Sequence, residues 1–243
     1  PEEVWQYHTD RMSTPGGNIP HLSEHTKSIV VSYLSKNFGP TSAHRELKLD
    51  NFQVDEETVS KAIYIEYDLV PPKEGKRRLH DPYPSLDGTV WFTDTGANSI
   101  FQLNPREPDF EKRLKDYPTP TPQAGLHGLT IDTRGHVYWS EMLGGHLGEF
   151  NPKTEKFTSH KFPTSGAMLQ VVADSQDNIW YNLARGNKIG KLDAETRQIT
   201  QWDIPTADSF PYGMIVDQKD RIWWSAIAQH RIGSFDPQTQ KLT

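Results

Sequence analysis

The chain has 243 residues, with 26 Lys or Arg against 32 Asp or Glu and a formal net charge of −6. This balance argues against a general nucleic-acid binder, which needs a basic face. No apolar run approaches the ~20 residues of a membrane-spanning helix. Cysteine is absent, which excludes disulfides, thiolate metal sites and a cysteine nucleophile.

The first forty residues predict a helical hairpin. The chain begins at Pro1 without an initiator Met or a signal peptide, so we expect a processed chain or a fragment. An amphipathic piece runs from Glu2 to Met12, and Ser23 is a suitable N-cap for a second helix that Gly39 ends. Residues 41–60 are polar and predict a linker between this hairpin, residues 1–40, and the rest of the chain.

The amino-acid sequence of the hairpin resembles the C-terminal segment of a known domain family. The segments Pro1–Trp5, Arg11–Met12 and Ser32–Pro40 are similar to the C-terminal tail of bacterial c-type cytochrome-like domains. In that family a Met before the last helix can be an axial haem ligand, and Met12 has that position. The attachment motif of two Cys and a His is absent, so we do not expect haem in this chain and interpret Met12 as a packing residue. The resemblance implies a periplasmic or secreted protein and, with a cytochrome domain, an electron-transfer partner.

A repeat of about 43 residues follows. Four aromatic segments begin 47, 42 and 43 residues apart: Val90–Asp94, Val137–Glu141, Ile179–Leu183 and Ile222–Ala226. A turn precedes each segment, an apolar anchor follows ten residues after its start, and a Pro- or Asp-containing turn comes next. The period and the turns predict four-stranded antiparallel blades of a β-propeller over residues 61–243.

The two ends of the repeat leave the number of blades open. Residues Ala62 to Leu69 predict an outermost strand without a blade of its own, and the chain stops at Thr243, where the last blade's outermost strand begins. In one interpretation the Ala62–Leu69 strand completes the last blade and four blades close a ring. We favour the other, in which these are four blades of a longer propeller.

Two columns of residues show where the blades differ. The first column lies ten residues before the start of each aromatic segment and contains His80, His127, Leu169 and Tyr212. The second column lies four residues after the start and contains Asp94, Glu141, Leu183 and Ala226. His127 and Glu141 are equidistant from their hairpin turn, as are His80 and Asp94, which predicts that each His faces its carboxylate across the strands. Because innermost strands line a propeller's channel, both pairs are expected at the same mouth.

Such a mouth has two chemical interpretations. Two imidazoles and two carboxylates can bind a divalent cation or move protons. Alternatively, His and Asp or Glu at strand ends only satisfy the backbone of loops. Tyr212 can stack a ligand there or belong to the core. The spacing alone leaves these alternatives open.

The aligned blades resemble the virginiamycin B lyase (streptogramin lyase) family. The resemblance rests on three sequence segments, Val90–Ile100, Leu126–Asp132 and Gly186–Asp193. It implies a seven-bladed propeller that opens a cyclic depsipeptide antibiotic by elimination, and thus a role in antibiotic resistance. In the family a His abstracts the proton α to the carbonyl, and Mg²⁺ held by glutamates stabilises the enolate.

The resemblance assigns roles to individual residues. His127 takes the place of the base, Glu141 that of a metal ligand, and His80 that of a second His on the preceding blade. The family's other metal-binding Glu stands two residues before the base, where this chain has Gly125. Asp94 is the residue here that can replace that ligand.

Three hypotheses follow from the sequence. The first is a Mg²⁺-dependent carbon–oxygen lyase that takes a small-molecule or cyclic peptide ligand at the channel mouth, with His127 and His80 catalytic, Glu141 and Asp94 on the metal and Tyr212 on the substrate. The alternative is a non-catalytic, partner-binding propeller fused to an electron-transfer module. A lactone-hydrolysing propeller, the third class, needs more metal ligands than Leu169 and Ala226 provide.

Overall fold

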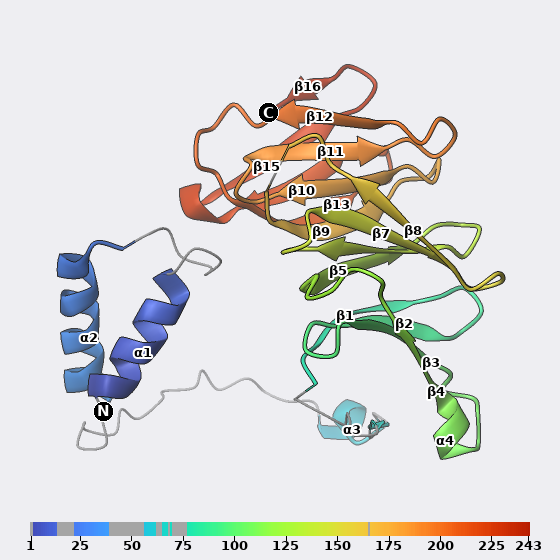
Figure 1. The fold of residues 1–243 in the computed structure, drawn as a ribbon, viewed down its shortest axis with the longest axis horizontal. Helices are drawn as coiled ribbons and strands as arrows, with labels where there is room; N and C mark the ends of the chain where they lie inside the picture. Colours follow the sequence, from blue (N-terminus) through green and yellow to red (C-terminus); the bar gives the residue numbers. More distant parts are fainter. Residues whose placement is uncertain are drawn as a thin grey trace. The chain divides into compact units, whose positions relative to one another are not determined.

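The structure is a computed structural model that describes residues 2–13, 22–38, 56–61, 65–67, 69, 77–164 and 166–243. The chain divides into two compact units, Pro1–Tyr67 and Asp68–Thr243, drawn in Figure 1. Among the described residues, no helix is long and apolar enough to cross a membrane.

The first unit contains the helical hairpin that the sequence predicts. Helix α1 spans Glu2–Ser13 and helix α2 spans Glu24–Phe38. The Ser23 hydroxyl accepts the backbone N–H of Thr26 at 3.2 Å, as an N-cap does. The Met12 side chain lies outside the described part. So does most of the predicted linker, whose described end forms a four-residue helix, α3 (Glu56–Val59).

The second unit consists of four antiparallel sheets of four strands, each formed by consecutive segments of the chain. The first blade comprises β1 (Leu79–Pro84), β2 (Val90–Asp94), β3 (Ser99–Leu103) and β4 (Leu114–Pro118), with the short helix α4 (Phe110–Arg113) before β4. The second comprises β5 (Leu126–Ile131), β6 (Val137–Glu141), β7 (His146–Asn151) and β8 (Lys156–Lys161). The third comprises β9 (Met168–Ala173), β10 (Ile179–Leu183), β11 (Lys188–Leu192) and β12 (Ile199–Asp203). The fourth comprises β13 (Pro211–Val216), β14 (Ile222–Ala226), the 3₁₀ turn η1 (Ile227–Gln229), β15 (Arg231–Asp236) and β16 (Lys241–Leu242).

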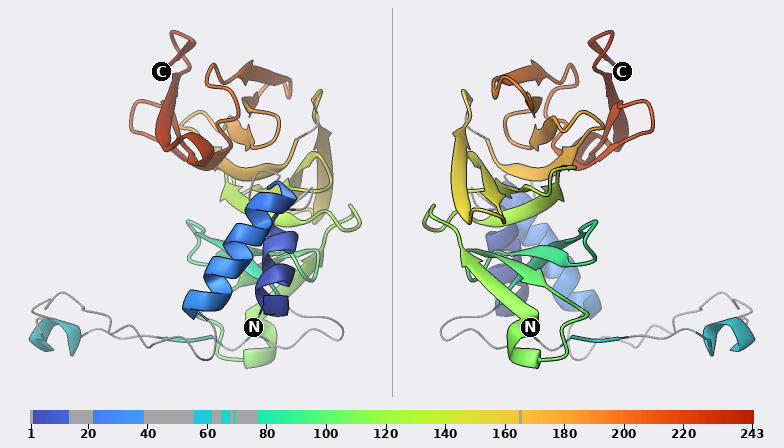
Figure 2. Two further views of the ribbon diagram at one scale, coloured as in Figure 1. Left: turned by 90° about the vertical axis from the view of Figure 1, so that its left-hand side faces the viewer. Right: turned by 90° about the vertical axis from the view of Figure 1, so that its right-hand side faces the viewer.

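The blades follow one another as in a propeller. Strand β5 packs beside β1, β9 beside β5, and β13 beside β9, so that the innermost strands succeed each other in chain order. Figure 2 shows the same succession from green to red. The last blade takes its own fourth strand, β16, from the chain's end. Of the strand expected over Ala62–Leu69, residues 62–64 and 68 lie outside the described part, and the others belong to no strand.

Large aromatic side chains fill the space between the sheets. Trp91, Trp139 and Trp180 are at most 2% exposed. On the third strand, a glycine opposite the aromatic ring makes room for it: a Cβ on Gly148 would lie 2.0 Å from Trp139. The first blade instead pairs Phe92 with Phe101, whose rings stack with centroids 5.4 Å apart.

Side-chain clamps join neighbouring blades at the turns between their first and second strands. The Thr133 backbone N–H and hydroxyl both donate to the Asp177 carboxylate of the third blade, at 2.8 and 2.7 Å. Ser175 does the same to Asp220 of the fourth blade, at 3.0 and 2.6 Å. We call the boundary between two blades a seam, so these clamps brace the second and third seams.

The first seam, between the first and second blades, differs from the other two at these turns. In the first seam, Leu86 stands at the position of Thr133 and Gly135 at the position of Asp177. Leu86 is 94% exposed, and the φ of Gly135 is +85°. A cavity of about 480 Å³ lies there, lined by Leu86, Gly135, Trp91 and their neighbours. The first seam therefore lacks the carboxylate clamp that the other two have.

Candidate functional site

A bulge at the same place in every blade positions the column residues His80, His127, Leu169 and Tyr212. The pairing of the first and second strands shifts by one residue between His80 and Tyr83, between Leu126 and Leu129, between Met168 and Val171, and between Pro211 and Met214. One extra residue on the innermost strand leaves backbone groups without ladder partners. Each column residue thus stands at a bulge.

A polar side chain on each second strand supplies the missing partners. Ser140 accepts the Gly128 N–H at 2.7 Å, and Ser225 accepts the Gly213 N–H at 3.0 Å. Side chains at this position of the second strand also reach the next blade. The Thr93 hydroxyl donates to the His127 carbonyl at 2.6 Å, and the Ser140 hydroxyl donates to the Leu169 carbonyl at 3.0 Å. These residues were missed in the sequence, although each is the polar fourth residue of an aromatic strand.

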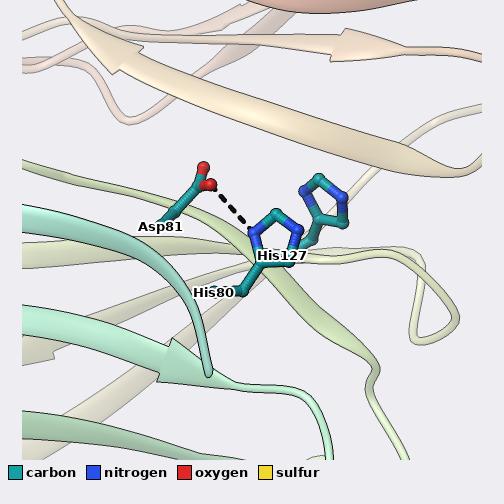
Figure 3. Close-up of side chains that lie close together, drawn as sticks. All are labelled: His80, Asp81 and His127. Atoms are coloured by element: carbon teal, nitrogen blue, oxygen red, sulfur yellow. Dashed lines mark hydrogen bonds and ion pairs between the residues drawn. The ribbon is translucent and has the colours of Figure 1, made fainter. Parts of the chain in front are cut away.

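The bulges bring three column side chains together. The His80 and His127 rings have centroids 3.8 Å apart and an interplanar angle of 40°. The Tyr212 ring meets His127 edge-on, with centroids 5.9 Å apart. We call the surface formed by these three side chains and Leu169 the channel mouth. The predicted meeting of the two imidazoles from neighbouring blades is present, as Figure 3 shows.

Hydrogen bonds determine which nitrogen each ring presents. His127 Nδ1 lies 2.9 Å from the Leu169 carbonyl, which only accepts, so Nδ1 carries the proton and Nε2 keeps its lone pair when the ring is neutral. Burial lowers the pKa of His127, and the neighbouring His80 lowers it further against the opposing effects of Asp81 and the Leu169 carbonyl. His127 is therefore a neutral base at neutral pH.

Asp81 is a site residue that the sequence comparison overlooked. Its Oδ1 lies 2.8 Å from His80 Nδ1, so the carboxylate orients the ring as Figure 3 shows. Its Oδ2 is buried and has no hydrogen-bond partner. The backbone φ of Asp81 is +31°, a value that most side chains avoid. The sequence holds no signal for this residue, because Gly128 and Gly213 at the corresponding positions do not share its positive φ.

The expected pairing of each His with a carboxylate is wrong by one residue. Glu141 pairs with Leu126, and Asp94 pairs with Leu79. The bulge adds one unpaired residue to the innermost strand between the turn and these pairs, and so shifts the pairing by one residue. Equidistance from the turn predicts partners only in an uninterrupted ladder. His80 instead faces Thr93.

The two carboxylates make contacts of their own. Asp94 is fully buried and accepts the backbone N–H groups of Arg78, Gly96 and Ala97 at 2.8–3.0 Å. Glu141 is 1% exposed, accepts the Trp139 indole N–H at 3.3 Å, and has one oxygen 3.6 Å from His146. Burial raises the pKa of Glu141, with Thr121, His146 and Trp139 opposing the rise.

The residues present do not fit a magnesium ion. Mg²⁺ takes oxygen ligands in octahedral geometry, whereas the one group of three metal-ligating side chains among the described residues is His80, Asp81 and His127. Gly125 stands at the family's other Glu position with φ +64°, and a Cβ there would lie 3.0 Å from Leu143. A Glu at this position would be strained.

The fold defines the class of the protein: its successive four-stranded antiparallel blades are those of a β-propeller. The sequence model of the virginiamycin B lyase family matches residues 63–241, and the chain belongs to that family. Among curated proteins, none matches the sequence significantly.

Solved structures agree with this family. A catalytically inactive histidine-to-alanine variant of virginiamycin B lyase from Staphylococcus aureus with quinupristin is 26% identical, with a TM-score of 0.64 over 72% of this chain and 56% of that one. A streptogramin B lyase is 22% identical, with a TM-score of 0.63 over 71% and 55% of the two chains. A periplasmic gluconolactonase from Pseudomonas aeruginosa shares the fold at 16% identity, with a TM-score of 0.54 over 68% and 52%. The chain thus spans about half the length of these structures.

Proposed function

We propose that this propeller is a carbon–oxygen lyase that opens a cyclic depsipeptide ester by elimination at the channel mouth. One observation carries the proposal: His127, held through Nδ1 by the Leu169 carbonyl, lies against His80 with ring centroids 3.8 Å apart. A catalytically inactive variant of the similar S. aureus lyase lacks a histidine, which supports a histidine base in this family.

The chemistry follows from the form of His127. Its neutral Nε2 takes a proton from a carbon next to a carbonyl, and the C–H electron pair becomes a carbon–carbon double bond. The neighbouring C–O bond breaks, and the ester oxygen leaves with its electrons as a carboxylate. No water is consumed, so the opened product has the same mass as the cyclic substrate. A general base supplies about 10²–10⁴-fold of the rate of such a step.

His80 and Tyr212 complete the mouth in this proposal. His80 is the second imidazole in contact with His127 and receives or returns the proton. Asp81 acts as a positioning residue, because its carboxylate accepts a hydrogen bond from His80 Nδ1–H. The lone pair of His80 is then on Nε2. The Tyr212 ring, edge-on to His127, supplies an aromatic wall for the ligand.

The expected magnesium site has less support. The proposal that Glu141 and Asp94 hold Mg²⁺ rests on the family resemblance, and both carboxylates make other contacts in this chain. No step of the mechanism is therefore routed through a metal. The expectation of an exported protein with an electron-transfer partner also stays a prediction that rests on the N-terminal resemblance.

The test is a product analysis. The full chain is incubated with a cyclic depsipeptide ester, with and without Mg²⁺, and the product is analysed by mass spectrometry. Elimination gives a ring-opened product of unchanged mass with a new double bond. A product heavier by one water means hydrolysis and contradicts the proposal, as does the absence of turnover at every Mg²⁺ concentration.

A second candidate is a propeller that binds a ligand at the mouth without converting it. Gly125 favours it, because the family's second metal-binding Glu is missing there. This candidate predicts that His127→Gln changes ligand affinity while no product forms with either protein.

A further inference from the structure

Three donors of mixed type meet at the channel mouth. One ligand atom each of His80, Asp81 and His127 lies within 4.8 Å of the others. The donors come from two neighbouring blades, since His80 and Asp81 lie on β1 and His127 lies on β5. Figure 3 shows the carboxylate and the two imidazoles gathered beside the ribbon.

The surroundings of these side chains match those of metal ligands. A histidine that binds a metal through one nitrogen nearly always donates its other N–H to a carboxylate or a backbone carbonyl. The Leu169 carbonyl holds His127 in this way and leaves its Nε2 available. His80 Nδ1 and Asp81 Oδ1 lie 2.8 Å apart, so these two atoms can bind one ion in place of the proton between them. Asp81 Oδ2 is buried without a hydrogen-bond partner, which is unfavourable unless another group binds it.

We propose that His80, Asp81 and His127 bind a divalent transition-metal ion of the zinc type through three protein ligands. Imidazole nitrogens favour Zn²⁺, Co²⁺ and Ni²⁺, whereas Mg²⁺ prefers oxygen ligands. Three protein ligands leave a coordination position for water or for a ligand, as in catalytic rather than structural zinc sites. The inference concerns the residues of the proposed lyase site but does not depend on lyase activity.

The proposal has a consequence for that site. A metal on His127 Nε2 occupies the lone pair that acts as the base, so the metal-bound and the proton-abstracting forms exclude each other. Micromolar Zn²⁺ is then expected to inhibit the elimination, and a chelator to restore it.

The experiment measures metal binding directly on the full, untagged chain. Co²⁺ titration is expected to give a visible d–d spectrum that saturates at one equivalent and is displaced by Zn²⁺ but not by millimolar Mg²⁺. Asp81→Asn keeps the size of the side chain and removes its charge, and His80→Gln and His127→Gln each remove a nitrogen donor. Each variant is expected to weaken Co²⁺ binding at least about tenfold.

His230→Asn is the matched control. His230 is exposed on the same unit and has φ +52°, a conformation that Asn tolerates. It should bind Co²⁺ like the original chain, and circular dichroism should show that all four variants are folded. Binding that is equal in all variants, that is competed by Mg²⁺, or that is absent at millimolar Co²⁺ would overturn the proposal, whatever the outcome of the lyase assay.

Discussion

The first seam, between the first and second blades, differs from the other two at both of its ends. At the mouth it joins His80 to His127, whereas the second seam places Leu169 beside His127. At the turns it has a cavity of about 480 Å³ where the other seams have carboxylate clamps. The backbone bulges are nevertheless the same in all blades. The comparison indicates that one repeated scaffold holds the strands of all blades, and the proposed chemistry depends on a few side chains at one seam.

The second seam is also braced by charge. Glu149 of the second blade accepts hydrogen bonds from Arg197 of the third blade, from His160 at 2.7 Å and from Tyr138 at 3.1 Å. Burial opposes ionisation of Glu149, but the His160 hydrogen bond and the Arg197 charge outweigh it and hold the pKa at about 2. The second seam therefore has both a carboxylate clamp and a charged cluster, whereas the first seam has no carboxylate clamp at its turns.

The largest expected effect concerns the base at the first seam. His127→Gln should lower the rate of elimination by about 10²–10⁴-fold, because it removes the proton acceptor. Mass-spectrometric rates for the original chain and the variant measure this loss. Tyr212→Phe keeps the ring beside His127 and should retain most of the rate. An active His127→Gln protein would remove the catalytic distinction between the seams.

The brace of the second seam should contribute most to stability. Glu149→Ala leaves Arg197, His160 and His136, whose Nδ1 lies 3.2 Å from Glu149, facing a vacated buried position. It should lower the free energy of unfolding by about 3–5 kcal/mol. Because the folded pKa of Glu149 is about 2, below its usual 4.5, its contribution is present above pH 4.5 and is lost as the pH falls toward 2. Urea unfolding at several pH values should show a larger loss in the original chain than in the variant, which keeps the other carboxylates of lowered pKa such as Asp193.

The pH dependence of turnover tests the protonation state of His127. Burial and His80 place its pKa below the usual 6.5, so the base form predominates above that value. The acid limb of kcat/KM should therefore lie below pH 6.5 and fall about tenfold per pH unit. An acid limb centred above pH 6.5 would show that His127 is not the base.

The clamps of the second and third seams should have a smaller effect. Asp177→Ala and Asp220→Ala each remove two hydrogen bonds between blades, so each should lower the free energy of unfolding by about 1–3 kcal/mol. Thermal or urea unfolding measures both. Asp87→Ala at the first seam, whose carboxylate contacts only its own turn through Thr89, is the control and should change the stability less.

The smallest effect should come from building a clamp into the first seam. Leu86→Thr together with Gly135→Asp copies the residues of the second seam, and Asp177 already adopts a positive φ at the corresponding position. The double variant should gain about 0.5–1.5 kcal/mol of stability. The same pair should leave the rate at the mouth unchanged, since the clamp lies at the opposite end of the strands. A loss of stability would show that the seams differ in backbone geometry as well.

Much of the fold was predictable because blade repeats leave regular marks. The aromatic strands, the turns and the glycines opposite large rings recur at fixed spacing, and the structure shows the four blades they predict. The meeting of His80 and His127 followed from their common place in the repeat. Repetition therefore determines which side chains come together.

The detailed partners were not predictable in the same way. A bulge adds one residue without changing the hydrophobic pattern, so Glu141 and Asp94 were assigned to the wrong neighbours. The role of Asp81 depends on a positive φ and a contact to the adjacent His80, neither of which spacing reveals. Ser140 was overlooked because its function is to satisfy that unpredicted bulge.

The most direct test of the account is the mass of the product formed from a cyclic depsipeptide ester by the full chain. If the paired imidazoles of the first seam carry out elimination, the ring opens with no change in mass, and the His127→Gln variant forms this product about 10²–10⁴-fold more slowly. A product that has gained one water, or equal product from the variant, would contradict the assignment of the chemistry to His80 and His127.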